Sequence, residues 1–86
     1  MIYRYRQDVL EQLRAHGVQP RPTTDPELVH EFVSDLYRHE LRRLRDRLRR
    51  REIPKAEYAN HVVALRKRYI LVSIPVRYWT RGSDGP

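Results

Sequence analysis

Arginine is the residue type whose number and spacing give this sequence its clearest chemical potential. Residues 38–52 read RHELRRLRDRLRRRE, in which eight arginines stand against three acidic residues, a net charge of +5. A guanidinium group is permanently charged and donates paired hydrogen bonds to a carboxylate or a phosphate. Leu41, Leu44 and Leu48 recur in this run at helical spacing. The run therefore predicts a helix with a narrow apolar stripe and a dense cationic remainder.

Such a helix can follow the phosphate backbone of a nucleic acid, because each phosphate contact releases counterions. A second basic cluster lies on the next predicted helix and would join the first if the two helices pack together. The candidate polyanion-binding residues are Arg38, Arg42, Arg43, Arg45, Arg47, Arg49, Arg50, Arg66, Lys67 and Arg68. The alternative is a solvated surface that is partly neutralised in place, with Glu40 beside Arg43 and Asp46 beside Arg49 and Arg50.

Other kinds of site find little support in the sequence. The absence of cysteine excludes disulfides, thiolate metal sites and a cysteine nucleophile. Among the four histidines, His39 has a carboxylate, Asp35, at the i, i+4 spacing of a metal-binding pair, and that spacing equally suits a surface ion pair. The glycines form no phosphate-binding loop, and no serine lies in a nucleophile-elbow sequence. We therefore expect no enzyme, no metal site and no cofactor.

Three helices are expected to position the arginines. The first is predicted at about residues 2–16, where apolar side chains repeat on one face from Ile2 to Leu13. Gly17 suits the left-handed position that follows a helix, and Val18 would then close back onto Leu13.

The second helix is predicted at about residues 25–51. Its start allows two caps, either Asp25 followed by a proline or a capping box made by Thr24 and Glu27. Its apolar stripe shifts by about 100° between the first and second halves, which indicates two different neighbours. We expect the first half to pack on the first helix and the second half on a third helix at about residues 54–69.

The second and third helices are expected to form an antiparallel hairpin. Their apolar positions share one spacing, with Tyr37, Leu41, Leu44 and Leu48 on one helix and Tyr58, Val62, Leu65 and Tyr69 on the other. A short turn joins them, as in helical hairpins generally. This register places Tyr37 near Tyr69, and it packs Leu44 and Leu48 against Val62 and Tyr58.

The hairpin segment resembles the SHOCT-type short C-terminal helical hairpin over about residues 41–65. The residues that carry the resemblance are Leu44, Leu48, Ile53, Pro54, Glu57, Tyr58 and Leu65. In the family the turn reads Ile-Thr-x-x-Glu-Phe, whereas this chain has Pro54 in place of the threonine and lacks the glycine before the isoleucine. The resemblance implies an interaction or oligomerisation unit and no chemistry of its own.

Residues 70–79 are expected to form an extended apolar arm. Apolar side chains alternate there with a period of two, and Pro75 excludes the interior of a helix. A chain of 86 residues has a small core, so we expect this arm to pack against a second subunit in a symmetric homodimer. The expected subunit-interface residues are Ile74, Val76, Tyr78 and Trp79, although the last two could instead stack on bases.

These features predict an all-α protein with one domain at residues 1–80 and a flexible tail at 81–86. The start of the sequence is charged from its fourth residue and no long apolar run follows, so we expect no signal peptide, no membrane association and a cytoplasmic location. The leading hypothesis is non-enzymatic binding of structured RNA or DNA by shape and charge. The alternative is a helical homo-oligomerisation or adaptor module whose arginines face solvent and have no nucleic-acid role.

Overall fold

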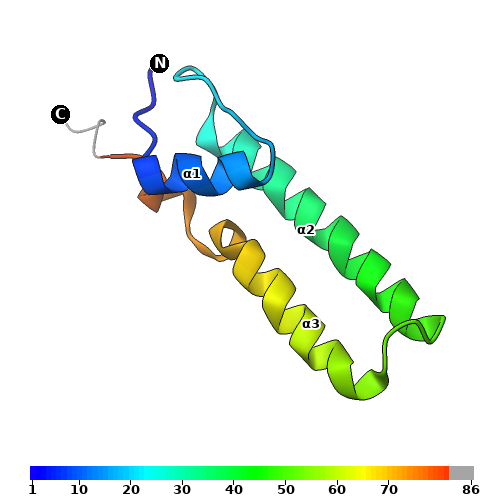
Figure 1. Cartoon of the computed structure of the whole chain (residues 1–86). Helices are drawn as coiled ribbons and strands as arrows, with labels where there is room; N and C mark the ends of the chain where they lie inside the picture. The colour runs from blue at the N-terminus through cyan, green and yellow to red at the C-terminus, as the bar shows by residue number, and fades with distance from the viewer. Residues whose placement is uncertain (82–86) are drawn as a thin grey trace.

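The computed structural model describes residues 1–81. Within them the chain forms three α-helices and two short 3-10 turns. They are α1 (Gln7–Ala15), α2 (Pro26–Arg49), α3 (Lys55–Arg68), η1 (Ile70–Ser73) and η2 (Val76–Tyr78). The molecule is elongated, at 53 × 17 × 16 Å, because α2 and α3 run beyond the other elements as a hairpin (Figure 1). The predicted all-α fold with a hairpin of the second and third helices is confirmed. All but the first residue of the predicted flexible tail lies outside the described residues.

Helix α1 ends as its sequence predicts. Gly17 has a φ of 76°, and its backbone N–H donates to the carbonyl of Arg14 at 2.9 Å. The N–H of Val18 reaches back to the carbonyl of Leu13 at 2.9 Å. These two hydrogen bonds form a Schellman motif, so the glycine confirms the predicted end of the helix.

The start of α1 lies at Gln7, more than one turn later than predicted. The backbone of the preceding residues is paired with the C-terminal segment: the N–H of Arg6 donates to Trp79 at 2.9 Å, and Arg4 accepts from Arg81 at 2.8 Å. The Tyr5 hydroxyl also donates to the carbonyl of Thr24 at 2.7 Å. The pattern at positions 2 and 5 therefore does not extend the helix, because long-range hydrogen bonds hold this stretch of backbone out of it.

Helix α2 is capped at its start by Asp25, whose carboxylate accepts from the N–H of Glu27 at 2.9 Å. Thr24 makes no capping box, because its hydroxyl oxygen accepts from the N–H of Arg21 at 2.9 Å. At the other end the chain turns through Arg51, which has a φ of 60°. The N–H of Glu52 then reaches back to the carbonyl of Arg47 at 2.9 Å, so a second Schellman motif begins the hairpin turn without a glycine.

The hairpin brings Tyr37 beside Tyr69, as the equal spacing of its apolar residues predicts, whereas the pairing of Leu44 and Leu48 with Val62 and Tyr58 stays a prediction. The rings of Tyr37 and Tyr69 lie 5.4 Å apart at an angle of 45°. Farther along the hairpin, Leu44 and Leu65 are both buried. The buried side chain of Ile53 closes the far end of the apolar seam at the turn.

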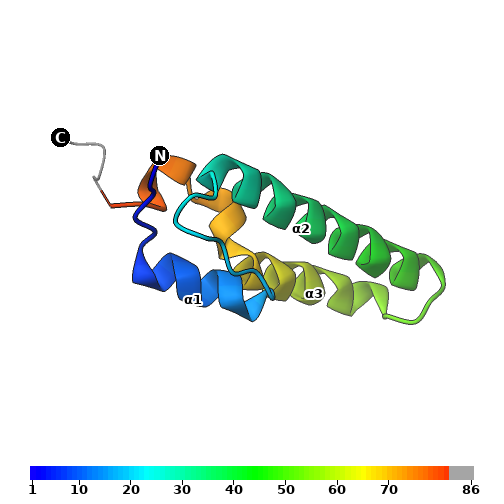
Figure 2. The ribbon, with the colours of Figure 1, turned by 90° about the horizontal axis from the view of Figure 1, so that it is seen from above.

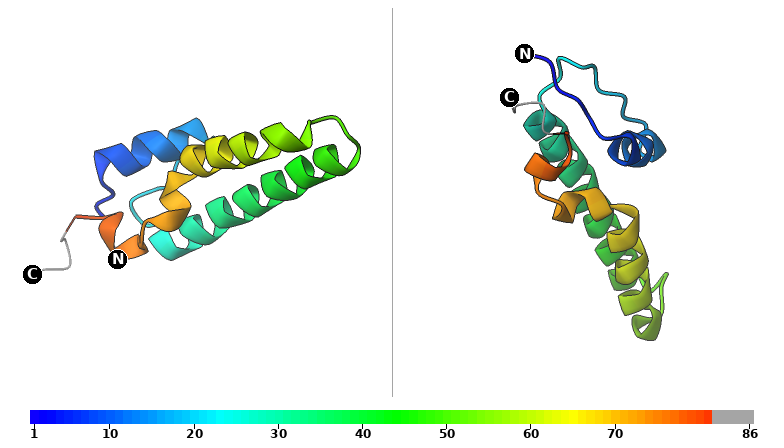
Figure 3. Two further views of the ribbon diagram at one scale, coloured as in Figure 1. Left: turned by 90° about the horizontal axis from the view of Figure 1, so that it is seen from below. Right: turned by 90° about the vertical axis from the view of Figure 1, so that its left-hand side faces the viewer.

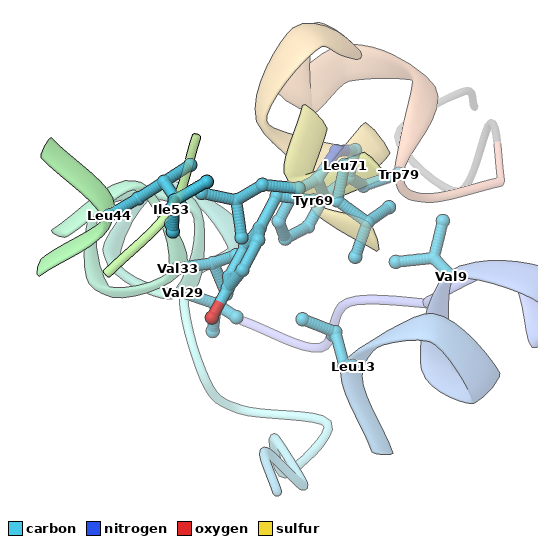
Figure 4. Close-up of a cluster of buried hydrophobic side chains, with 10 residues drawn as sticks. Val9, Leu13, Val29, Val33, Leu44, Ile53, Tyr69, Leu71 and Trp79 are labelled. Carbon is cyan, nitrogen blue, oxygen red and sulfur yellow. The ribbon is translucent and has the colours of Figure 1, made fainter. Parts of the chain in front are cut away.

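The main core lies where α1 and the first half of α2 meet the C-terminal segment (Figure 4). Trp79 and Leu13 are fully buried, and Leu71 is 1% exposed. Helices α1 and α3 lie on the same side of α2 (Figures 2 and 3). The first half of α2 packs mainly against η1 and η2, whereas the predicted main neighbour was α1.

The C-terminal segment is apolar, as predicted, but it does not form one extended arm. Its residues make two 3-10 turns on either side of Pro75. This arrangement turns both Leu71 and Trp79 inward, although the predicted apolar alternation at residues 72, 74, 76 and 78 belongs to the opposite period-two face. The indole N–H of Trp79 donates to the carbonyl of Ile74 at 3.1 Å, which fixes the ring within the core of its own chain.

Candidate nucleic-acid interface

The ten predicted polyanion-binding residues are all exposed, on α2 and α3. Most of them lie on the part of the hairpin that extends away from the main core (Figure 1). The apolar seam between the two helices uses only a narrow stripe of each helix. The remaining surface of α3 and of the second half of α2 is therefore open to a large partner.

Glu40 does not neutralise Arg43, which was its predicted partner. Its carboxylate instead lies 3.5 Å from the guanidinium of Arg68 across the hairpin, and it accepts a hydrogen bond from the Tyr69 hydroxyl. Tyr69 is buried, and a buried hydroxyl needs a hydrogen-bond partner. This requirement draws Glu40 toward α3 and leaves Arg43 without an acidic partner among residues 1–81.

The other ion pairs on the hairpin are exposed and weak. Arg38 pairs with Asp35, and Glu52 lies 3.8 Å from Arg47 and 3.7 Å from Arg50. Pairs of this kind contribute between about 0 and 1 kcal/mol. The predicted ion pairs of Asp46 do not form in the described part of the chain. The side chain of Arg50 instead donates a hydrogen bond to the backbone carbonyl of Asp46, at 3.4 Å.

Six of the ten predicted residues have no acidic partner within residues 1–81. They are Arg42, Arg43, Arg45, Arg49, Arg66 and Lys67. Like charges at helical spacing of three or four residues repel one another. The outer surface of the hairpin is therefore a cationic surface that is only partly neutralised from within the chain, and we call these six residues the unpaired cations.

A groove of about 260 Å³ runs between α2 and α3 beside these residues. It is lined by Glu40, Arg43, Leu44, Arg47, His61, Ala64, Leu65 and Arg68. Sequence reasoning identified its arginines but not His61 or Ala64. The hairpin register alone, which places the second half of α2 opposite α3, would have been enough to find them.

Two tyrosines, the buried Tyr69 and the half-buried Tyr5, hold their hydroxyl protons strongly. Burial, and after it the hydrogen bond to Glu40, raise the pKa of Tyr69 to about 12. Burial and the nearby charge of Asp25 raise the pKa of Tyr5 to about 12. Both hydroxyls are structural hydrogen-bond donors, to Glu40 and to the carbonyl of Thr24.

Two histidines join the helices to the C-terminal segment. The ring of His16 stacks on Tyr69 at 4.2 Å, and its Nε2 lies 2.9 Å from the carbonyl of Arg68. The ring of His30 lies 5.4 Å from that of Trp79, and its Nε2 is 3.1 Å from the carbonyl of Val72. Among residues 1–81, no three histidine or carboxylate side chains gather as metal ligands would.

The four residues expected at a subunit interface differ in their exposure. Ile74 and Val76 are half-buried, and Tyr78 is 55% exposed, with the guanidinium of Arg77 lying 4.8 Å from the centre of its ring. Trp79 has no exposed surface in a single chain. The indole is therefore occupied within its own subunit, and Tyr78 is the aromatic side chain of this segment that faces solvent.

Comparison with known proteins does not extend this description: no family model, curated protein or solved structure matches the chain. The resemblance of the hairpin segment to the SHOCT-type family remains a prediction. In the described residues, no helix combines the length and the apolar character that crossing a bilayer requires.

Proposed function

We propose that this protein is a non-enzymatic, cytoplasmic binding protein whose α2–α3 hairpin engages structured RNA or DNA. The observation that carries the proposal is the set of unpaired cations on the exposed surface of the hairpin. Phosphates would replace the acidic partners that these side chains lack. They would also relieve the repulsion between neighbouring guanidinium groups.

The spacing of the arginines suits contact with a backbone over several phosphates. Arg42, Arg45 and Arg49 follow one flank of α2 over about 10 Å of helix length. Arg43 and Arg47 follow the opposite flank, beside α3. Because recognition rests on charge and shape, we expect weak sequence specificity and a strong dependence of affinity on salt.

Fluorescence anisotropy with short labelled duplexes tests this proposal. If about six phosphates are contacted, the slope of log affinity against log salt concentration is about −5. Replacing Arg42, Arg45 and Arg49 together by glutamine reduces the magnitude of that slope by about 3, because three phosphate contacts are lost. All three side chains are exposed, so the fold is retained.

A matched control removes the same charge elsewhere. Arg4, Arg14 and Arg21 are also exposed but lie outside the hairpin. Their triple glutamine variant keeps most of the slope and the affinity. The proposal is wrong if the wild-type protein fails to bind at low salt, or if the two triple variants lose affinity equally.

The alternative function, a homo-oligomerisation module, is supported by a different observation. Leu28 and Phe32 stand one turn apart on the outer face of α2 and are 64% and 53% exposed. Acidic residues surround them, whereas the other half of α2 is basic. Two antiparallel copies of α2 would therefore match acidic halves with basic halves. Analytical ultracentrifugation of the wild-type protein and Phe32→Ser tests this alternative, since the substitution makes a dimer monomeric and leaves a monomer unchanged.

A further inference from the structure

The groove between α2 and α3 has the construction of a site for one compact anion. Its α2 wall carries Glu40, Arg43 and Arg47, and its α3 wall carries His61 and Arg68 among others. The ion pair of Glu40 with Arg68, at 3.5 Å, closes one end of the groove. The antiparallel register then places Arg47 and His61 toward the other end.

The charge of the lining leaves room for a dianion. Three arginines and one glutamate line the groove, so its net charge is +2 without any contribution from His61. The salt bridge with Glu40 already occupies Arg68. Arg43 has no acidic partner within residues 1–81, and Arg47 has only the exposed 3.8 Å contact with Glu52. The unpaired charge of Arg43 and the weakly paired charge of Arg47 therefore lie together on the α2 wall of the groove, and His61 and Ala64 belong to the α3 wall.

The shape of the groove favours the end of a molecule over the middle of a chain. The buried residues Leu44 and Leu65 line it together with Ala64, whose side chain is a single methyl group. A group that enters from solvent meets donors on both walls, with five N–H groups available on each arginine. A phosphate monoester presents three terminal oxygens and carries about −1.5 to −2 charges at pH 7. A backbone diester presents two such oxygens and one charge, and both of its ends continue as chain.

We propose that this groove is a binding site for a phosphate monoester, held by Arg43 and Arg47 with His61 on the opposite wall. The inference rests on the proposed function, since the groove lies within the same cationic surface. It adds a site for one terminal phosphate to the binding of a nucleic-acid backbone along the hairpin. The monoester has two possible sources, the 5′-phosphate of a nucleic-acid strand or a small phosphorylated molecule. Their shared chemistry is the terminal phosphate, and experiment separates the sources.

The first measurement compares single strands of one sequence, labelled at the 3′ end, with and without a 5′-phosphate. Anisotropy titrations give about tenfold tighter binding of the phosphorylated strand, the effect of about one charge-assisted hydrogen bond. Ala64→Leu fills the groove without changing any charge, so it abolishes this preference and leaves the affinity for the 5′-hydroxyl strand unchanged. Ala59→Leu adds the same bulk at an exposed position of α3 outside the groove and keeps the preference.

The second measurement is a titration with inorganic phosphate at constant ionic strength, followed by NMR of the backbone amides. Saturable shifts at the groove that disappear in Ala64→Leu, without a preference among strands, assign the site to a small phosphorylated molecule. A preference among strands assigns it to a 5′ end. If neither effect is seen, the inference is wrong. The proposed function would still stand in that case, provided that the 5′-hydroxyl strand binds with the expected salt dependence.

Discussion

Replacing Trp79 by alanine tests whether the C-terminal segment belongs to the core of its own chain. The indole has no exposed surface, and its N–H donates to the carbonyl of Ile74 at 3.1 Å. Removing a buried tryptophan side chain costs about 3–5 kcal/mol. A domain of 86 residues has a free energy of unfolding of roughly 4–13 kcal/mol, at 0.05–0.15 kcal/mol per residue. Trp79→Ala therefore removes a large share of the stability, whereas the adjacent change Tyr78→Ala, at a site 55% exposed, costs less than about 0.5 kcal/mol.

Urea unfolding followed by far-ultraviolet circular dichroism measures both losses. Trp79 is the single tryptophan of the chain, so iodide quenching of fluorescence reports on its exposure without ambiguity. We expect weak quenching, and an unfolding midpoint that does not change with protein concentration. A loss below about 1 kcal/mol for Trp79→Ala, together with free quenching in the wild-type protein, would refute the burial described above. A midpoint that rises with protein concentration would show that folding is coupled to self-association.

Three further perturbations follow from individual residues. Leu44 is 8% exposed, so Leu44→Ala lowers the free energy of unfolding of the protein by about 2–4 kcal/mol. A loss below about 0.5 kcal/mol in a urea titration would place Leu44 at the surface. Arg51→Gly gains about 0.5–1 kcal/mol, because glycine adopts the φ of 60° without strain, and an unchanged thermal midpoint would contradict that conformation. Because folding raises the pKa of Tyr5 and Tyr69 to about 12, their contribution to stability is complete below pH 10 and is lost as the pH rises through 12. In an absorbance titration Tyr5 and Tyr69 ionise near pH 12, and Tyr69→Phe removes one of these two late transitions. The absence of any transition near pH 12 would contradict the raised pKa of both side chains.

Local signals in the sequence predicted the helix ends and the hairpin register. Gly17 determines the end of α1 because the left-handed conformation that it supplies is unfavourable for other residues. The equal spacing of apolar residues predicted the contact of Tyr37 with Tyr69, because two helices with matching stripes have one antiparallel register that buries both. These features depend on a few neighbouring residues or on a simple repeat.

Features set by distant contacts were not predictable in the same way. The stretch around Tyr5 has a helical pattern, yet its hydroxyl bonds to Thr24 and its backbone pairs with the C-terminal segment. Glu40 has Arg43 at good helical spacing, but the buried hydroxyl of Tyr69 competes for the same carboxylate. The positively charged surface was therefore predictable from composition. The distribution of paired and unpaired cations on this surface was not predictable, because it depends on which acidic side chains form hydrogen bonds with buried residues.

The position of Trp79 in the sequence has a consequence for the time at which the protein folds. The hairpin joins neighbouring stretches of chain, so it can form as soon as α3 has been synthesised. Helix α1 precedes the hairpin, but the core around its buried residues Val9 and Leu13 is complete only when Leu71 and Trp79 have followed. Until then part of the apolar face of α1 stays open to chaperones and proteases, and the C-terminal segment ends that exposure.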